Sequence, residues 1–211
     1  MILMWDDALM MPVLETERLY IRPCTMDDLE ACHELYLDIG WADMTVSDAE
    51  NRERKRKWLE WTVRNYEELA RLQQPPYGER VVELKDTNQF AGMVGLVPLL
   101  KPFAQLPAFG GVAPEFAPFS AEVGLFWAIA PALQRRGIAT EAAAAMIEYA
   151  FGTLKVGRIL AGTEYDNVAS IGVMRRLGMR IERNPYPVPE WFQIHGVLER
   201  PAHMRVSPNP D

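Results

Sequence analysis

The sequence predicts a mixed α/β (α+β) domain built around one central sheet. Two patterns alternate along its 211 residues: short runs in which polar and apolar side chains alternate, and longer runs in which apolar side chains recur every three or four residues. The first pattern is typical of strands and the second of amphipathic helices. Their order is strand, helix, helix, three strands, helix, strand, helix and two strands, which favours helices packed on a single sheet.

The first strand and the first helix are predicted between residues 14 and 40. Residues 14–22 alternate as a strand and are stopped by Pro23. Thr25 precedes two aspartates, a typical helix start, and the helix is expected to reach Asp38 before Gly40 closes it. The side chains that this helix is expected to bury are Leu29, Cys32, Leu35 and Tyr36.

A long amphipathic helix is predicted over residues 47–74, with Ser47 as its cap and a Pro-Pro pair at its end. Within it, residues 52–57 include five basic side chains in six positions. We interpret them as a solvated helix face braced by ion pairs to interleaved glutamates, with a nucleic-acid patch as the alternative. The side chains expected to face the core are Trp58, Trp61, Val63, Tyr66, Leu69 and Leu72.

Two strands and an unusual loop are expected in the middle of the chain. Residues 80–85 and 90–100 flank a turn at 86–89 and predict a β-hairpin. Residues 101–120 contain four prolines, a Gly-Gly pair and four phenylalanines. A loop of this length in a compact domain is usually functional, so a lid or contact surface is expected, with a mobile insertion as the alternative.

The second half alternates strands and helices. Residues 121–129 are the most strand-like stretch, and an alanine-rich helix is expected over 140–151. A strand at Arg158–Thr163 precedes a helix that opens at residues 166–170 and ends at Gly178. The last predicted strands are 179–182 and 191–198, joined by a proline-rich turn at 184–189.

Length and composition indicate a single domain over residues 14–200, with an N-terminal extension at 1–13 and a C-terminal tail at 201–211. The net charge of −7 argues against general nucleic-acid binding, which needs a basic face. An acidic surface instead suits cationic amine substrates.

A cytoplasmic protein is expected. No apolar run approaches the roughly 20 residues that span a membrane. The apolar start meets Asp6 and Asp7 at once and therefore does not match a secretory signal. Cys24 and Cys32 lack the spacing of a metal site, which favours two reduced thiols.

A candidate phosphate site lies in residues 133–141, LQRRGIATE, between a predicted strand and the alanine-rich helix. A helix start exposes N–H groups without intrahelical partners at the positive end of the helix dipole. Gly137 lets a backbone approach a ligand closely, and Arg135 and Arg136 add positive charge. These features predict an anion site, with an ordinary helix start carrying two solvated arginines as the alternative.

Three stretches in order resemble the GNAT superfamily of acyl-CoA N-acetyltransferases. They are residues 15–23 (ETERLYIRP), residues 134–139 (QRRGIA) after a strand, and residues 167–179, which begin Asn-x-x-Ser. The resemblance covers roughly residues 14–200. Within the superfamily the chain is similar to the RimJ/RimL-type branch, whose named members acetylate ribosomal-protein N-termini.

The resemblance implies the GNAT fold: a central, mostly antiparallel mixed sheet with helices on both faces and splayed fourth and fifth strands, here 121–129 and Arg158–Thr163. It also implies acetyl-CoA as cosubstrate and no metal. The pantetheine arm would follow the fourth strand, the pyrophosphate would rest on the turn, and the asparagine would touch CoA. The cofactor-binding residues expected from this likeness are Phe126, Trp127, Ala128, Ile129, Gln134, Arg135, Arg136, Gly137, Ile138, Ala139, Thr140 and Asn167.

The chemistry of amide formation suggests two catalytic candidates. Amines are mostly protonated at neutral pH, so a base must take a proton before the free amine attacks the thioester. Glu122 could be that base, or a strand-end carboxylate facing solvent. Ser170 resembles a serine of RimJ/RimL-type members and could assist the leaving thiolate, or serve as a local backbone partner. Met174 stands where many GNAT members carry a tyrosine acid.

Likeness alone favours a protein N-terminal α-amino group as the acceptor. The alternatives are a small-molecule amine such as an antibiotic or polyamine, a non-catalytic acyl-CoA-binding module, and acetylation of tRNA through residues 52–57. Glu190 and His195 are secondary candidates for contacting the substrate. No membrane or nucleic-acid partner is expected, and the oligomeric state is left open, with a homodimer among the options.

Overall fold

The computed structural model describes residues 11–204, and the chain divides into two compact units. The first unit comprises the chain up to Gly95 together with Trp127–Ala145, and the second comprises Leu96–Phe126 and the chain from Met146 onward. Most of the predicted extension (1–13) and tail (201–211) lies outside the described residues. The single domain expected over 14–200 stays a prediction.

Eight strands form one mixed sheet in the order β1-β2-β3-β4-β5-β6-β8-β7. β5 pairs with β6 in parallel, whereas β1 with β2, β2 with β3, β6 with β8 and β7 with β8 are antiparallel. The predicted mixed, mostly antiparallel sheet is thereby confirmed. The strands are β1 Leu14–Glu15, β2 Leu19–Pro23, β3 Gly78–Leu84, β4 Phe90–Lys101, β5 Ser120–Ile129, β6 Arg158–Thr163, β7 Arg180–Arg183 and β8 Ile194–Glu199.

The parallel pair of β5 and β6 is short. Val123 lies opposite Ile159 and Gly124 opposite Leu160, although β6 continues to Thr163. These two strands are the ones that the GNAT resemblance expects to splay apart. A strand that runs on without its neighbour leaves backbone N–H and C=O groups available for other partners.

The prediction of a single strand over residues 14–22 is wrong, because a turn divides this segment into β1 and β2. The Thr16 N–H closes this turn by donating to the Leu19 carbonyl at 3.0 Å. The Thr16 hydroxyl also donates to the Glu141 carboxylate at 2.5 Å. Alternation of residue types could not reveal the turn, since this second contact comes from a residue distant in the sequence.

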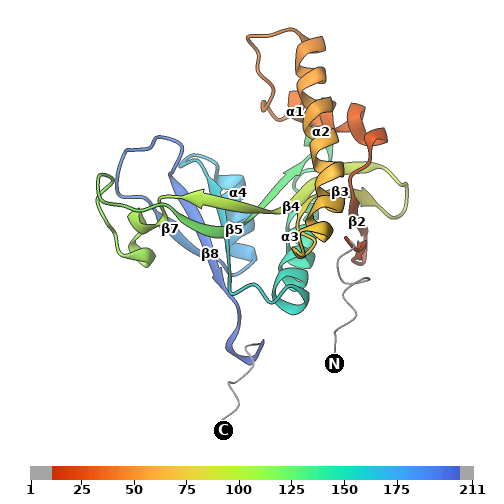
Figure 1. Cartoon of the computed structure of the whole chain (residues 1–211). Coiled ribbons are helices and arrows are strands. Elements are labelled where there is room, and N and C mark those ends of the chain that lie inside the picture. The colour runs from red at the N-terminus through yellow and green to blue at the C-terminus, as the bar shows by residue number, and fades with distance from the viewer. Residues whose placement is uncertain (1–10, 205–211) are drawn as a thin grey trace. The chain divides into compact units, whose positions relative to one another are not determined.

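Two helices of the first unit, α1 (Leu29–Asp38) and α2 (Asp48–Arg71), pack against each other (Figure 1). The Ser47 hydroxyl accepts a hydrogen bond from the Glu50 N–H at 3.2 Å, which confirms the predicted cap. α1 ends at Asp38, as predicted. In the described part of the chain, neither these helices nor any other is long and apolar enough to cross a membrane.

The buried face of α2 differs from the prediction. Trp61 and Leu72, expected inside, are 61% and 67% exposed. Hydrophobic spacing missed the true face because aromatic rings shelter a cation: the Lys55 Nζ lies 2.7 Å from the Tyr36 ring centroid and 4.2 Å from that of Trp58. Burial lowers the pKa of Lys55 to about 8. The side chains that α2 buries are Asn51, Lys55, Leu59, Thr62 and Leu69.

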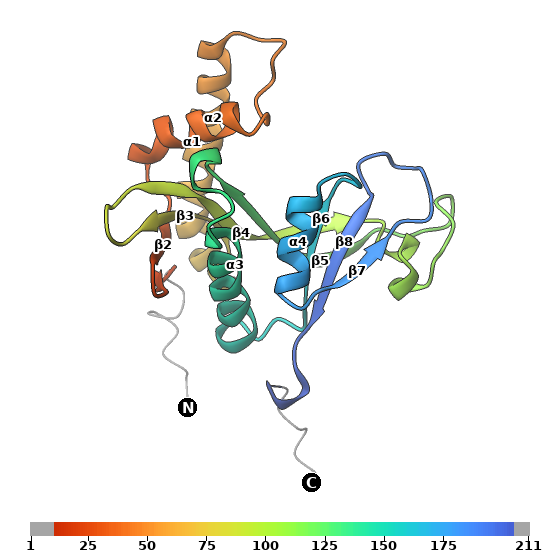
Figure 2. The ribbon, with the colours of Figure 1, turned by 180° about the vertical axis from the view of Figure 1, so that it is seen from behind.

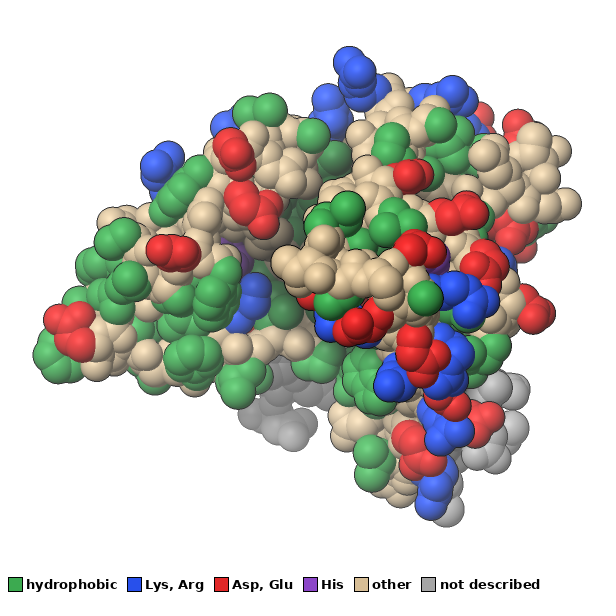
Figure 3. All heavy atoms as spheres, turned by 90° about the horizontal axis from the view of Figure 1, so that it is seen from above, with side chains coloured by type: hydrophobic (Ala, Val, Ile, Leu, Met, Phe, Trp, Pro, Cys, Tyr) green, Lys and Arg blue, Asp and Glu red, His purple; other side chains and the backbone are tan. Residues whose placement is uncertain are grey.

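The other basic side chains of residues 52–57 form ion pairs, as the solvated-face interpretation predicts. Arg54, for example, pairs with Glu50 at 2.6 Å and with Asp43 at 2.9 Å. Figure 3 shows basic and acidic side chains interspersed on one face of the molecule. The remaining pairs of this segment are Arg52–Glu30, Arg56–Glu53, Arg56–Glu60 and Lys57–Glu53.

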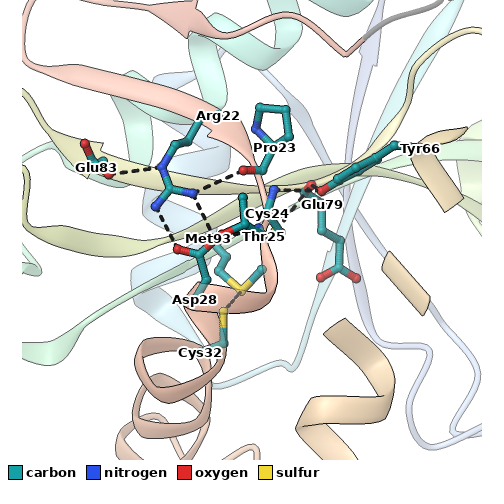
Figure 4. Close-up of polar contacts among 10 residues, drawn as sticks. All are labelled: Arg22, Pro23, Cys24, Thr25, Asp28, Cys32, Tyr66, Glu79, Glu83 and Met93. Atoms are coloured by element: carbon teal, nitrogen blue, oxygen red, sulfur yellow. Dashed lines mark hydrogen bonds and ion pairs between the residues drawn. The ribbon is translucent and has the colours of Figure 1, made fainter. Parts of the chain in front are cut away.

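A polar network ties β2 to β3 and to the start of α1 (Figure 4). The Arg22 guanidinium donates to Asp28 at 2.7 and 2.9 Å and to Glu83 at 3.1 Å. Although burial raises the pKa of Asp28, hydrogen bonds from Arg22 and Thr25 outweigh it and leave that pKa lowered. Asp28 is therefore an ionised, satisfied carboxylate in the folded protein.

Glu79 lies near this network, but its carboxylate is hydrogen-bonded less completely than that of Asp28. Its carboxylate points away from Arg22 and Asp28 (Figure 4), and its buried Oε2 has no hydrogen-bond partner in the described chain. Burial raises the pKa of Glu79 to about 7, and the nearby charge of Lys55 opposes that shift only in part. The folded protein therefore binds a proton at Glu79 more tightly than the unfolded chain does.

In the second unit, α4 (Val168–Arg176) packs against β8 (Figure 2). A Cβ on Gly196 would lie 2.8 Å from the Met179 sulfur and 3.1 Å from Met174, so β8 and the helix approach closely only at a glycine. Val197, the next residue, faces the other side of the sheet. On that side lies an apolar cluster of Phe103, Leu106, Leu160, Phe192 and Val197.

The first part of the unusual loop covers this apolar cluster. It forms two 3-10 turns, Phe103–Gln105 and Pro107–Phe109. Asn184 donates to the Gln105 side chain at 3.0 Å, and the Tyr186 hydroxyl donates to the Gly111 carbonyl at 2.8 Å. This part of residues 101–120 is therefore packed rather than a mobile insertion. Phe116 and Phe119, further along, are exposed.

Replacement of the buried carboxylate, Glu79→Gln, is expected to change how stability depends on pH. Because folding raises the pKa of Glu79 from 4.5 to about 7, its stabilising contribution is complete below pH 4.5 and is lost as pH rises through 7. Between pH 4.5 and 8 the wild type should therefore lose about 3 kcal/mol more unfolding free energy than the variant. Urea titrations at several pH values measure this difference.

The exposed carboxylate of Glu67, also in the first unit, provides the control. Glu67→Gln should leave the pH dependence of the wild type unchanged. Parallel curves for Glu79→Gln and the wild type would show that Glu79 titrates normally in the folded protein.

Candidate functional site

The turn between β5 and α3 (Ile138–Glu148) is exposed and has an unusual backbone. Residues 134–137 are all exposed, whereas Ile138 is buried. Arg135 has φ 60° and Gly137 has φ 82°, so two of its residues adopt the left-handed conformation. Glycine takes this conformation at little cost, but an arginine does so only where its surroundings require it. Residues 134–140 are called the anion turn below.

The anion turn presents positive potential to solvent. The first bond of α3 runs from the Glu141 N–H to the Gly137 carbonyl at 3.0 Å. The N–H groups of Ile138, Ala139 and Thr140 therefore have no intrahelical acceptor and mark the positive end of the helix dipole. Within residues 11–204, neither Arg135 nor Arg136 has a side chain in an ion pair. These exposed N–H groups and arginines are the features from which the sequence analysis predicts an anion site, and that site stays a prediction.

Two hydrogen bonds flank the left-handed Arg135. On one side the Gln134 side chain donates to the Ile129 carbonyl at 2.9 Å. On the other side the Arg18 guanidinium donates to the Arg136 carbonyl at 3.0 Å. Gln134 thus braces the turn through its side chain, a role that its place in the motif did not reveal. Arg18, which no sequence argument singled out, lay within the quoted ETERL stretch.

The end of β5 leads into the anion turn within the first unit. Ala128 and Ile129 are buried, and Trp127 is half-buried. Gly92 of β4 allows an unusually close approach to these residues: a Cβ on it would lie 2.8 Å from the Ile129 Cα and closer still to the Ala128 carbonyl oxygen. Its φ of 148° is also disfavoured for other residues. Position 92 therefore requires glycine, which the sequence analysis did not predict.

Glu122 lies in the second unit, beside an open hollow of about 650 Å³. Burial raises its pKa, and the charge of Arg158, whose Nη1 is 3.5 Å away, opposes that shift. The carboxylate is mostly buried, since its side chain is 17% exposed. It is therefore neither freely solvated nor locked in a short ion pair. The residues that line the hollow are Pro98, Ala121, Glu122, Val123, Val156, Gly157, Arg158, Glu199 and Arg200.

Asn167 and Ser170 lie at the start of α4 in the second unit. The Asn167 side chain caps the helix, because its Oδ1 accepts the Ser170 N–H at 3.0 Å. This leaves the Asn167 amide N–H groups for another partner. The Ser170 hydroxyl is half-buried and forms no hydrogen bond with the described residues, so it is not the local backbone partner considered as an alternative. Met174 is fully buried against β8.

The secondary candidates differ in their surroundings. His195 is 1% exposed, and its ring lies 4.2 Å from the Phe192 ring and edge-on to Phe103. Burial lowers its pKa to about 3, helped by the charge of Lys101, so the ring stays neutral near pH 7. This argues against His195 as a general base. Glu190 is exposed, and its carbonyl accepts the Gln193 amide at 2.7 Å.

The predicted residues fall into two sets. Within the first unit the structure brings together the end of β5 and the anion turn, and within the second it holds the β5 start and α4. In the described part of the chain, no group of three or more His, Cys, Asp or Glu side chains could hold a metal ion. The first-unit set is Trp127, Ala128, Ile129, Gln134, Arg135, Arg136, Gly137, Ile138, Ala139 and Thr140, and the second-unit set is Glu122, Phe126, Asn167 and Ser170.

A mixed sheet in which β5 leads through a turn into α3 and then pairs briefly in parallel with β6 is the architecture of an acetyltransferase of the GNAT fold. The chain belongs to the Acetyltransferase (GNAT) domain family, whose model matches residues 18–180. It is an N-acetyltransferase, as are two curated relatives by name. The first is N-acetyltransferase YoaA of Bacillus subtilis (strain 168), 28% identical over 94% of this chain and 93% of YoaA. The second is YnaD of the same strain, 39% identical over 32% of this chain and 38% of YnaD.

Solved structures share the fold at lower identity. An acetyltransferase from Agrobacterium tumefaciens str. C58 aligns with a TM-score of 0.63 at 21% identity, covering 90% of this chain and 95% of that one. RimL, a ribosomal L7/L12 alpha-N-protein acetyltransferase in complex with coenzyme A, aligns with a TM-score of 0.57 at 14% identity, covering 89% and 98%. These likenesses confirm the GNAT fold.

Replacement of Gly92 by alanine tests the close approach of β4 to β5. The added Cβ would meet backbone atoms of Ala128 and Ile129, which cannot rotate away, so Gly92→Ala should lower the unfolding free energy by about 2–4 kcal/mol. Urea denaturation measures the loss. Gly152→Ala is the matched control, because no atom lies within 4 Å of a Cβ there. Equal stability of the two variants would contradict the role of Gly92.

Proposed function

We propose that the protein transfers acetyl from acetyl-CoA to a primary amine, with the anion turn as its CoA-phosphate site. The observation that carries the proposal is the exposed turn in which Arg135 and Gly137 are left-handed and the first N–H groups of α3 are unpaired. The open space at Gly137 supports the fit: only the Arg18 guanidinium lies within 4 Å of a Cβ there, at 3.4 Å. A diphosphate group matches these donors in charge and chemistry.

The chain offers distinct groups for distinct parts of the cosubstrate. N–H groups of residues 135–140 would hold the pyrophosphate, together with Arg135 and Arg136, which form no ion pair with the residues that the structure describes. The backbone of residues 126–129 would follow the pantetheine arm, whose amides need hydrogen-bond partners. The Asn167 amide, free because its oxygen caps α4, would add a contact. Bound acetyl-CoA supplies the thioester that the amine attacks.

Glu122 and Ser170 are the proposed catalytic residues. The raised pKa of Glu122 makes it a stronger base than an ordinary carboxylate, directly or through a water molecule. The hollow beside it has room for an amine-bearing group. Ser170 carries a hydroxyl without a protein partner in the described chain, which suits donation to a departing thiolate. Neither role requires a covalent intermediate or a metal.

A protein N-terminal α-amino group is the favoured acceptor, as in the RimJ/RimL-type members that the chain resembles. An α-amino group has a pKa of roughly 8, whereas that of a lysine is roughly 10.4. A carboxylate base therefore removes the proton from an α-ammonium group more readily than from a lysine. The likeness to RimL supports this choice. Such an acceptor is compatible with cytoplasmic action and with either a monomer or a homodimer.

Two observations favour alternative functions, a small-molecule amine acetyltransferase and a non-catalytic acyl-CoA-binding module. The hollow of about 650 Å³ falls within the size range of small-molecule sites, which favours a small amine as the competing acceptor. Met174, buried where many members have a tyrosine acid, favours a non-catalytic acyl-CoA-binding module. Turnover with peptide N-termini, with small amines or with neither separates the three.

Calorimetric titration with acetyl-CoA, with free CoA in parallel, tests the proposed site. Micromolar binding is expected for the wild type. Gly137→Glu should abolish it, because the variant places a side chain and a negative charge among the phosphate donors. Gly152→Glu, an exposed glycine of the second unit, is the control and should bind normally. Binding by Gly137→Glu at wild-type affinity would move the phosphate site elsewhere.

Ser170→Ala tests the proposed thiolate partner. Loss of the hydroxyl should lower kcat about tenfold or more, while the Kd for acetyl-CoA changes less than about twofold. Steady-state kinetics and calorimetry measure the two effects. Because the Ser170 N–H, not its hydroxyl, bonds to Asn167, the cap survives the change. An unchanged kcat would leave Ser170 without a catalytic role.

A further inference from the structure

The Glu141 carboxylate ties the ETERL segment to the start of α3. The Thr16 hydroxyl donates to its Oε1 at 2.5 Å and the Arg18 N–H to the same oxygen at 3.0 Å. The Arg18 guanidinium donates to Oε2 from Nε at 2.7 Å and lies within an ion-pair distance of 2.5 Å through Nη2. Although partial burial raises the pKa of Glu141, these hydrogen bonds leave it lowered, so the carboxylate is ionised at neutral pH.

The same guanidinium continues into the anion turn. While Nε and Nη2 bind Glu141, Nη1 donates to the Arg136 carbonyl at 3.0 Å. This bond holds the peptide between the two left-handed residues, Arg135 and Gly137. A left-handed arginine costs of order 1 kcal/mol and persists only where neighbouring contacts fix it. Arg18 provides one such contact, and the Gln134 side chain provides the other.

The turn has little other support. Residues 134–137 are exposed, and the atom nearest to a Cβ on Gly137 belongs to Arg18. Beside the turn is a hollow of about 280 Å³, lined in part by Arg18, Arg136 and Ile138. Because residues 134–137 are exposed, this part of the backbone depends on polar contacts for its shape.

We infer that Arg18 and Glu141 are positioning residues that fix the anion turn in its ligand-binding conformation. Glu141 fixes the guanidinium, and the guanidinium fixes the Arg136 carbonyl. The backbone N–H groups therefore point toward solvent before a phosphate arrives, and binding does not have to order them. The ligand class, a phosphate-bearing acyl donor, rests on the proposed function, whereas the order of the turn does not.

Arg18 could instead act as a plain positive charge, and lysine separates the two roles. A lysine keeps the charge but cannot bond to Glu141 and the Arg136 carbonyl at the same time, since it lacks the planar fork of arginine. If positioning matters, Arg18→Lys should bind acetyl-CoA as poorly as Arg18→Met. If charge alone matters, Arg18→Lys should bind as the wild type does.

The experiment combines hydrogen exchange of residues 134–140 with calorimetry and steady-state kinetics. Arg18→Met, Arg18→Lys and Glu141→Gln should each speed exchange in the turn and raise the Kd for acetyl-CoA about tenfold. The kcat at saturating acetyl-CoA should stay within about twofold, because the variants leave the catalytic residues untouched. Combining Arg18→Met with Glu141→Gln should cost little more than either change alone, since both break one linked network.

A control variant and a measurement of folding separate loss of the positioning role from general loss of structure. Arg64→Met removes an exposed arginine that pairs with Glu60 at 3.3 Å on α2, and it should change nothing. Thermal unfolding of each variant shows whether the fold is retained. Wild-type affinity and exchange in Arg18→Lys would overturn the inference. Absence of CoA binding in the wild type would overturn the proposed function, whereas faster exchange in the variants would still support the positioning role.

Discussion

The structure around the anion turn depends on one carboxylate, that of Glu141. It accepts hydrogen bonds from Thr16 and Arg18, so a residue in the first turn of α3 anchors the start of the folded chain. The same network stabilises the turn that separates β1 from β2, because the Thr16 hydroxyl that donates to Glu141 also accepts the Leu19 N–H at 3.0 Å. The same bonds bring a guanidinium to the Arg136 carbonyl, where the backbone adopts its costly conformation.

Burial shifts the pKa values of several ionisable groups, and the surroundings of each group decide whether it could exchange protons with a substrate. Asp28 is ionised and fully paired, and His195 is held neutral among aromatic rings, so neither is suited to exchange protons near pH 7. Glu79 and Lys55 have pKa values moved toward neutrality, but neither residue lines the hollow beside Glu122. Of these groups, Glu122 alone combines a raised pKa with an open hollow, which is what a base for an incoming amine requires.

Local patterns predicted the features that local physics determines. The cap at Ser47, the strand Arg158–Thr163 and the start of a helix near residues 166–170 all follow from short-range rules. The turn inside residues 14–22 was missed because Glu141, which stabilises it, is distant in sequence. The face of α2 was misjudged because aromatic rings shelter Lys55 while Trp61 stays exposed. Gly92 was missed because only the approach of β5 requires it.

The acyl donor and the amine acceptor would be bound by different kinds of group, backbone for the donor and side chains for the acceptor. In the proposed function the anion turn would bind phosphate through backbone N–H groups, and such binding tolerates substitution wherever the backbone conformation is preserved. Conformation is in turn set by side chains that do not touch the ligand, such as Arg18 and Glu141. Under the proposed function, side chains that line the hollow near Glu122 would face the amine acceptor directly. Affinity for the acyl donor should therefore depend on the network behind the turn, whereas acceptor choice depends on surface side chains that can change without disturbing it.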